Sequence, residues 1–269
     1  MIRLVATDLD GTFLSATGEV SQVNRLAVAR AADLGCTVVV ATGRPSRWLD
    51  VLDDVPGLSR QVIVSNGAAT FDLDSGEHHT VFGLDPQIAV AVADDLRAAI
   101  PGVTFGFEWG HAFGREPDTM AGTDGDWLLT APLAELASVP QPVLKLLAFH
   151  ERCSSDQLSR LGRPVVGDRL TVTHSHTASY GLLEISCAGV TKATALAALC
   201  ETLRVEQEEV AAFGDMPNDA AMLAWAGHGY TMPAGHPELA HFPVADSGRQ
   251  DEAVGRRLLA LLDATSLLN

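Results

Sequence analysis

The sequence predicts an α/β fold, with a doubly wound, Rossmann-like parallel sheet as the core and an inserted α+β domain. Three observations predict it. Short runs rich in valine and isoleucine alternate with helical segments at the start of the chain and again near its end. Between them, strands come in hairpin-like pairs. The length of 269 residues suits one large domain or a core with a smaller second domain. We expect the core at 1–82 and 187–269 and the inserted domain at 83–186.

The first part of the chain alternates strictly between strand and helix. The expected elements are strands at 2–7, 37–41 and 62–64, and helices at about 21–34 and 46–54. Ser21 is a suitable N-cap for the first helix, and Gly35 is a suitable end. This order of elements favours a parallel sheet with helices on both faces.

The inserted domain shows a different pattern. Asp85 and Pro86 suit the N-cap and first position of a long helix that ends near Ile100. Ser154 and Gln157 form a capping box for a second helix. Expected strands are 103–109, 112–115, 143–149, 170–173 and 182–185. The core pattern then resumes with a helix from 192, a strand at 210–213, a helix from 217 and a terminal helix from 251.

Composition limits the classes of partner. The formal net charge of −16 opposes binding to nucleic acid and to anionic membranes. No apolar segment is long enough to span a bilayer, and the N-terminus lacks the pattern of a signal peptide, so we expect a cytoplasmic protein. The four cysteines have no spacing typical of zinc ligands. The first strand is not followed by the glycine pattern of dinucleotide-binding proteins.

Four of the expected strands end in polar residues suited to phosphate or metal chemistry. The four ends are Asp8, Thr42-Gly43-Arg44, Ser65-Asn66-Gly67 and Gly214–Asp219. The carboxyl ends of parallel strands share one edge of a sheet, which is where such folds build their sites. The sequence therefore predicts one site assembled from these four ends.

Asp8 and Asp10 stand one residue apart directly after the first strand. Two carboxylates this close repel each other unless a cation or hydrogen bonds compensate them. Asp8 is a candidate nucleophile towards phosphorus, and Asp10 is a candidate general acid and base. A pair of surface or helix-capping aspartates is the alternative for an isolated Asp-x-Asp, but the longer pattern Asp-x-Asp-Gly-Thr-x-Leu disfavours it.

Candidate anion-binding groups come from two further segments. Thr42 and Gly43 are expected at the start of a helix, where a hydroxyl and free N–H groups can bind phosphate, and Arg44 adds a fork of donors. Lys192 is expected in the first turn of its helix, where a cation is unfavourable unless an anion lies nearby. Simple helix capping and an exposed lysine are the alternatives.

Asp215 is the candidate third carboxylate for a metal ion. Together with Asp8 and the backbone carbonyl of Asp10 it would give the few oxygen ligands that Mg²⁺ takes from proteins. Asn218 could reach the phosphate, and Asp219 could orient Lys192 or a metal-bound water. Helix capping remains the alternative for these last two residues.

These segments together resemble the haloacid dehalogenase-like superfamily, and within it the Cof-type phosphatases with a large α+β cap domain. Four signatures carry the resemblance: Asp8-Leu9-Asp10-Gly11-Thr12, Thr42-Gly43-Arg44, Lys192 after Gly189, and Gly214–Asp219. The resemblance implies a Mg²⁺-dependent phosphomonoesterase with Asp8 as nucleophile and Asp10 as acid and base. It implies phosphate contacts from the Leu9 amide, Thr42, Gly43, Lys192 and Asn218. We expect three further residues to support the site: Arg44, Asn66 and Asp219. The inserted domain would then be the cap domain that selects the substrate.

The expected substrate is a small phosphorylated metabolite, with a sugar phosphate favoured. A phosphohexomutase of the same superfamily is the main alternative, because it would share the first chemical half of the reaction, and a non-catalytic binding protein is a third. His174 and His176, which are expected to alternate on a strand with both rings on one face, are candidate substrate contacts in the cap domain. Trp109 is a third candidate. The oligomeric state stays open.

Overall fold

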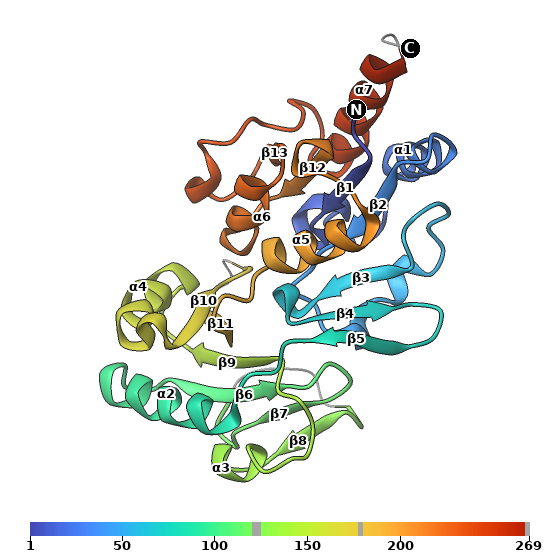
Figure 1. The fold of residues 1–269 in the computed structure, drawn as a ribbon. Coiled ribbons are helices and arrows are strands. Elements are labelled where there is room, and N and C mark those ends of the chain that lie inside the picture. The colour runs from blue at the N-terminus through green and yellow to red at the C-terminus, as the bar shows by residue number, and fades with distance from the viewer. Residues whose placement is uncertain (120–124, 177–179, 267–269) are drawn as a thin grey trace. The chain divides into compact units, whose positions relative to one another are not determined.

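The structure is a computed structural model, and it describes residues 1–119, 125–176 and 180–266 (Figure 1). The chain divides into two compact units by its internal contacts. Unit 1 contains residues 1–44, 48–79 and 191–269, and unit 2 contains residues 45–47 and 80–190. No helix of the described part is long and apolar enough to cross a membrane.

Unit 1 is built on a parallel sheet with the strand order β13-β12-β1-β2. Its strands are β1 (Leu4–Thr7), β2 (Thr37–Val40), β12 (Val210–Gly214) and β13 (His228–Thr231). β1 is central and fully buried, and its Leu4 pairs with both Thr37 and Val210. The predicted doubly wound α/β core is therefore confirmed.

A second small sheet extends this arrangement. It has the order β3-β4-β5, with β3 at Gln61–Val64, β4 at Ala69–Asp72 and β5 at Glu77–Val81. Parallel bridges from Val38 to Leu58 and from Ala41 to Ile63 place β3 beside β2. The third polar strand end thus lies at the same edge as the first two.

Helices of unit 1 pack on the two faces of the parallel sheet. They are α1 (Gln22–Asp33), α5 (Lys192–Leu203), α6 (Ala220–Trp225) and α7 (Ala253–Ser266). Leu4 and Ala6 of β1 belong to one core cluster with residues of α5 and α6. Val5 points the opposite way because side chains alternate along a strand. The other helices, α1 and α7, pack against each other, and α1 contacts β2.

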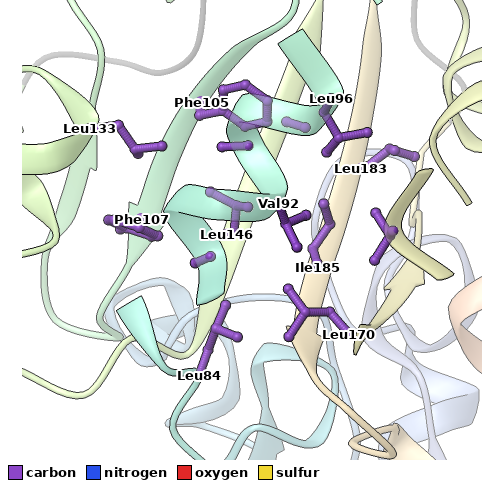
Figure 2. Packing of buried hydrophobic residues seen from close by; sticks show 14 of the residues in the cluster. Leu84, Val92, Leu96, Phe105, Phe107, Leu133, Leu146, Leu170, Leu183 and Ile185 are labelled. Carbon is purple, nitrogen blue, oxygen red and sulfur yellow. The ribbon is translucent and has the colours of Figure 1, made fainter. Parts of the chain in front are cut away.

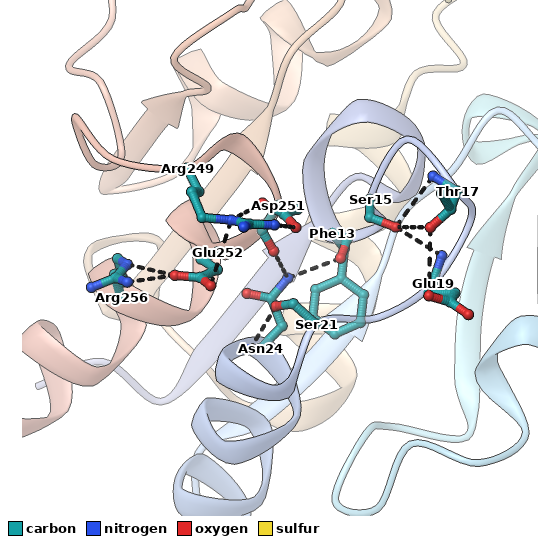
Figure 3. A network of polar contacts seen from close by, with 10 residues as sticks. All are labelled: Phe13, Ser15, Thr17, Glu19, Ser21, Asn24, Arg249, Asp251, Glu252 and Arg256. Carbon is teal, nitrogen blue, oxygen red and sulfur yellow. Dashed lines mark hydrogen bonds and ion pairs between the residues drawn. The ribbon is translucent and has the colours of Figure 1, made fainter.

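Asn24 ties the loop after β1 to the terminal helix (Figure 3). Its buried amide donates to the Phe13 carbonyl at 2.9 Å and to the Asp251 carbonyl at 3.1 Å. Its Oδ1 accepts from the Gly255 N–H at 2.9 Å. Ser21 caps α1 as predicted, since its side chain accepts from the Asn24 N–H. One side chain therefore satisfies three backbone groups far apart in sequence.

We expect Asn24→Ala to lower the free energy of unfolding by about 2–3 kcal/mol, because it leaves three backbone groups without their partner. Chemical denaturation followed by circular dichroism would measure the loss. Ser21→Ala, which removes only the N-cap bond, is the matched control and should cost about 1 kcal/mol. Equal losses in the two variants would contradict this account of Asn24.

Unit 2 contains a six-stranded sheet in the order β10-β11-β9-β6-β7-β8. The strands are β6 (Thr104–Glu108), β7 (Phe113–Arg115), β8 (Leu128–Thr130), β9 (Lys145–His150), β10 (Leu170–Thr173) and β11 (Gly181–Cys187). Neighbouring strands are antiparallel except β7 and β8. This sheet differs in kind from the parallel core, as the sequence predicts.

Helices α2 (Pro86–Ala99), α3 (Leu133–Leu136) and α4 (Ser155–Val166) pack with this sheet around one core. Figure 2 shows that core, in which Val92 and Leu96 of α2 pack with residues of the sheet, among them Phe105 and Ile185. Asp85 accepts from two N–H groups at the start of α2, and Ser154 and Gln157 form the predicted capping box.

Three predictions of secondary structure need correction. The helix expected at 46–54 is instead two short 3₁₀ turns, Ser46–Trp48 and Asp50–Leu52. The helix expected from 217 begins with a 3₁₀ turn, Pro217–Asp219, before α6. Residues 174–176 were expected to alternate on a strand, but β10 ends at Thr173. The elements expected from the sequence do not include β4, β5, β8, β13 or α3.

Candidate active site

The loop after β1 brings two acidic segments together. Asp8 follows β1 directly, and its N–H donates to the carbonyl of Phe213 on β12 at 2.9 Å. Gly11 has a φ of +76°, and a Cβ at this position would lie 2.3 Å from Oδ2 of Asp215. Thr12 donates from Oγ1 to Oδ1 of Asp215 at 3.1 Å. A glycine is needed here because any side chain would displace the Asp215 carboxylate.

Lys192 is the buried cation of the site. It is the first residue of α5, it follows the N-cap Thr191, and it has no exposed surface. Its Nζ donates to Oδ1 of Asp8 at 2.5 Å and to Oδ1 of Asp219 at 2.7 Å. These two carboxylates account for a lysine in the first turn of a helix, where a cation is otherwise unfavourable.

Asp219 uses both of its carboxylate oxygens for contacts within the protein. Oδ1 accepts from Lys192, and Oδ2 accepts from the N–H groups of Asp215 and Met216, each at 3.0 Å. A Cβ on Gly214 would lie 2.4 Å from the Cβ of Asp219, so this loop also depends on a glycine. Asp219 therefore fixes Lys192 and shapes the loop that carries Asp215.

The carboxylates carry more negative charge than Lys192 offsets. Burial raises the pKa of Asp8 well above its ordinary value. Attraction to Lys192 lowers this pKa in part, and repulsion from Asp219 and Asp215 raises it further. Burial, with repulsion from Asp219, raises the pKa of Asp215 to about 7. Burial lowers the pKa of Lys192, but Asp219 and Asp8 outweigh it, so that this pKa is raised. A further cation would relieve this excess charge.

Oxygen atoms of Asp8, Asp215 and Asp219 lie within 4.8 Å of one another, close enough to hold a metal ion. The hydrogen bonds of Asp219 leave Asp8 and Asp215 as the carboxylates better placed to bind one. Oxygen ligands of this kind are what hard divalent cations such as Mg²⁺ take. The residues thus fit a divalent metal ion.

Asp10 lies in a very different environment from Asp8. Its side chain is 57% exposed, against 8% for Asp8. Arg44 donates to both oxygens of the Asp10 carboxylate, from Nη2 at 2.6 Å and from Nε at 2.8 Å, and its Nη1 donates to the Trp48 carbonyl at 2.9 Å. The two acids of the Asp-x-Asp pair are therefore held by different cations.

Thr42 is buried two residues beyond the end of β2, but it does not begin a helix, because the 3₁₀ turn at Ser46–Trp48 follows. The prediction that Thr42 and Gly43 lie at a helix N-terminus is wrong. Thr42 Oγ1 instead accepts from the Arg44 N–H at 3.0 Å in a tight local turn. Its hydroxyl hydrogen is not used in that bond.

Asn66 and Asn218 meet although they come from different strand ends. Nδ2 of Asn218 donates to Oδ1 of Asn66 at 3.0 Å, and both residues are buried. The Asn66 N–H donates to the Thr42 carbonyl at 3.0 Å. Leu9, whose amide is the remaining expected phosphate contact, is buried beside Asp8.

Two further residues support the site, although the sequence pattern did not single them out. Thr12 holds Asp215, which its place in the Asp-x-Asp-Gly-Thr pattern could have suggested. Gln250 donates to the Gly11 carbonyl at 2.5 Å and accepts from the Ala234 N–H at 2.9 Å. No local signal in the sequence marks Gln250, because its partners lie far away in the chain.

Two of the three candidate substrate contacts from the inserted domain have side-chain partners within unit 2. His174 Nε2 lies 2.9 Å from Oδ1 of Asp156, and His176 Nδ1 lies 3.2 Å from Oγ of Ser155. Trp109 is buried. Substrate contact by these three residues stays a prediction.

Comparison with known proteins agrees with this geometry. A family described as haloacid dehalogenase-like hydrolase matches residues 5–243. The 5-amino-6-(5-phospho-D-ribitylamino)uracil phosphatase YcsE of Bacillus subtilis is 28% identical over 86% of this chain and 84% of its own. The HMP-PP phosphatase of an Enterobacter species is 28% identical over 99% of this chain and 98% of its own.

Solved structures show the same fold. A haloacid dehalogenase-like hydrolase from B. subtilis has a TM-score of 0.79 and 24% identity, covering 97% of this chain and 100% of its own. A phosphatase from Bacteroides thetaiotaomicron has a TM-score of 0.77 and 24% identity, covering 97% of this chain and 95% of its own. The predicted resemblance and the prediction of an enzyme of the phosphatase class are confirmed.

Proposed function

The chain belongs to the haloacid dehalogenase-like hydrolases, and on this basis we propose that it is a Mg²⁺-dependent phosphomonoester hydrolase that acts through an aspartyl-phosphate. The observation that carries the proposal is the buried Asp8, paired with Lys192 and next to Asp215 at the carboxyl ends of two adjacent parallel strands. A buried carboxylate with its own cation and a candidate metal site is suited to attack a phosphoryl group.

In this proposal, Asp8 attacks phosphorus and the ester oxygen leaves. The phosphoryl oxygens are bound by the Leu9 amide, Thr42, Gly43, Lys192 and Asn218. The side chains of Asp8 and Asp215 and the carbonyl of Asp10 would hold Mg²⁺. Bound there, the ion would supply positive charge to carboxylates and phosphate alike, which lowers the cost of bringing anions together.

Asp10 moves the proton in both halves of the reaction. It protonates the leaving alkoxide, and it then takes a proton from the water that cleaves the aspartyl-phosphate. Its exposed carboxyl group suits an exchange of protons with substrate and water, whereas the buried Asp8 suits attack. Arg44 supports the step by orienting Asp10 through two hydrogen bonds.

The substrate is proposed to be a small phosphorylated metabolite, with a sugar phosphate favoured. We propose that residues 83–186 form the cap domain that selects it. The curated relatives named above act on a phosphoribitylamino uracil and on HMP-PP. Both compounds belong in a substrate panel beside the sugar phosphates.

Phosphate release from an aryl phosphate and from this panel tests the proposal. We expect release that requires Mg²⁺, stops with a chelator and returns when Mg²⁺ is added in excess. Hexose 1-phosphate distinguishes the main alternative, because a mutase would form hexose 6-phosphate without free phosphate. Release that is equally fast in chelator would overturn the Mg²⁺ dependence.

A further inference from the structure

The Ser65–Asn66–Gly67 turn between β3 and β4 has an uncommon backbone. All three residues have positive φ angles, of 51°, 60° and 96°. A left-handed backbone is unfavourable for residues that carry a Cβ, although asparagine tolerates it best. Two such residues in succession persist only where the surroundings hold them. The contacts of the turn are therefore informative.

The backbone of the turn contacts two of the predicted phosphate-binding segments. N–H groups of Ser65 and Asn66 donate to the carbonyls of Arg44 and Thr42, each at 3.0 Å. A Cβ on Gly67 would lie 2.2 Å from the carbonyl oxygen of Thr191, the residue before Lys192. The turn thus packs between the loop that carries Thr42 and the start of α5.

The side chain of Asn66 reaches the third segment. Its Oδ1 accepts one N–H of the Asn218 amide, which leaves the second N–H of that amide for a ligand. Three buried polar atoms here have no hydrogen-bond partner in the described part of the chain: Asn66 Nδ2, Asn218 Oδ1 and Ser65 Oγ. Buried polar atoms without partners are costly, and a bound ligand or water would satisfy them.

We propose that Asn66 is a positioning residue for the phosphoryl group of the substrate. The strained turn presents its amide so that Oδ1 fixes the rotamer of Asn218, and the second Asn218 N–H then binds a phosphoryl oxygen. This inference rests on the proposed function, because it takes Asn218 as a phosphate contact.

Binding of inorganic phosphate in the presence of Mg²⁺, measured by calorimetry, tests the proposal without any need for turnover. Asn66→Gly removes the amide and relieves the strain of the turn, because glycine adopts positive φ freely. We expect it to weaken phosphate binding about tenfold, the effect of losing a well-placed hydrogen bond to a charged group. In an Asn218→Ala background, the same substitution should cause no further loss.

Arg204→Gly is the matched control. Arg204 is also a non-glycine residue with positive φ, 54°, at the end of α5, so the substitution relieves similar strain away from the site. Its phosphate affinity should equal that of the wild type. If Asn66→Gly does not fold, Asn66→Asp should bind phosphate more weakly than the wild type, since it places a carboxylate beside the anion.

The outcomes separate this inference from the proposed function. Wild-type affinity in Asn66→Gly, or losses that multiply in the double variant, would overturn the role of Asn66. Wild-type protein that binds phosphate but hydrolyses no ester would overturn the proposed function and leave the positioning role standing. If the catalytic efficiency of Asn66→Gly falls mainly because KM rises, with a smaller change in kcat, this result would support the positioning role.

Discussion

Asp8→Asn is expected to lower kcat for an aryl phosphate by about 10³-fold or more, because it removes the nucleophile and the alternative routes are slow. The variant should fold. Asparagine keeps the size of the side chain and removes a buried carboxyl group. Burial and two neighbouring carboxylates raise the pKa of that group, which means that its charged form is unfavourable in the folded protein. Its melting temperature without metal should therefore be no lower than that of the wild type. Steady-state kinetics and thermal unfolding would measure both effects.

Asp10→Asn is the companion variant, because it leaves the nucleophile in place and removes the proposed acid and base. The variant should still form the aspartyl-phosphate, although more slowly than the wild type. It should no longer hydrolyse this intermediate at a measurable rate. Full activity in Asp8→Asn would remove Asp8 as the nucleophile. Loss of activity together with loss of the fold would show that Asp8 has a structural role instead.

Lys192→Met is expected to lower the free energy of unfolding of unit 1 by about 3–5 kcal/mol, because it leaves buried carboxylates without their cation. Lys192 has no exposed surface and contacts both Asp8 and Asp219. Activity should fall as well, through loss of a phosphate contact. Chemical denaturation and kinetics on the folded fraction would measure the two effects separately.

The double variant Lys192→Met/Asp8→Asn is the control for this prediction. It removes one of the two unpaired charges, so it should recover part of the lost stability while it remains inactive. A double variant that is less stable than Lys192→Met would contradict the view that these groups form one compensated cluster.

The positions of the acidic residues were predictable because they depend on local rules. Asp8 and Asp215 each follow a short apolar strand, and parallel strands end at the same edge of a sheet. The nearby glycines, Gly11 and Gly214, were visible too, although the reason for Gly11, its close approach to Asp215, depends on two distant segments. Local pattern thus locates the site, whereas its close contacts arise only in the folded chain.

The segment at 46–54 shows why one element was wrong. Its composition permits a helix, but the side chain of Arg47 pairs with the distant Glu108 at 2.6 and 2.8 Å. These contacts accompany short 3₁₀ turns rather than a regular helix. The pairings of Arg44 with Asp10 and of Asn66 with Asn218 likewise depend on side chains far apart in sequence, which no local pattern reports.

Covalent phosphorylation of Asp8 tests the central claim most directly. Wild-type protein would be mixed with an aryl phosphate and Mg²⁺, quenched within one turnover, treated with borohydride to convert an acyl phosphate to a stable product, and mapped by mass spectrometry. We predict modification of the peptide that contains Asp8, converted to homoserine at that position, and none in Asp8→Asn. Turnover by the wild type with the modification on another residue would contradict the account.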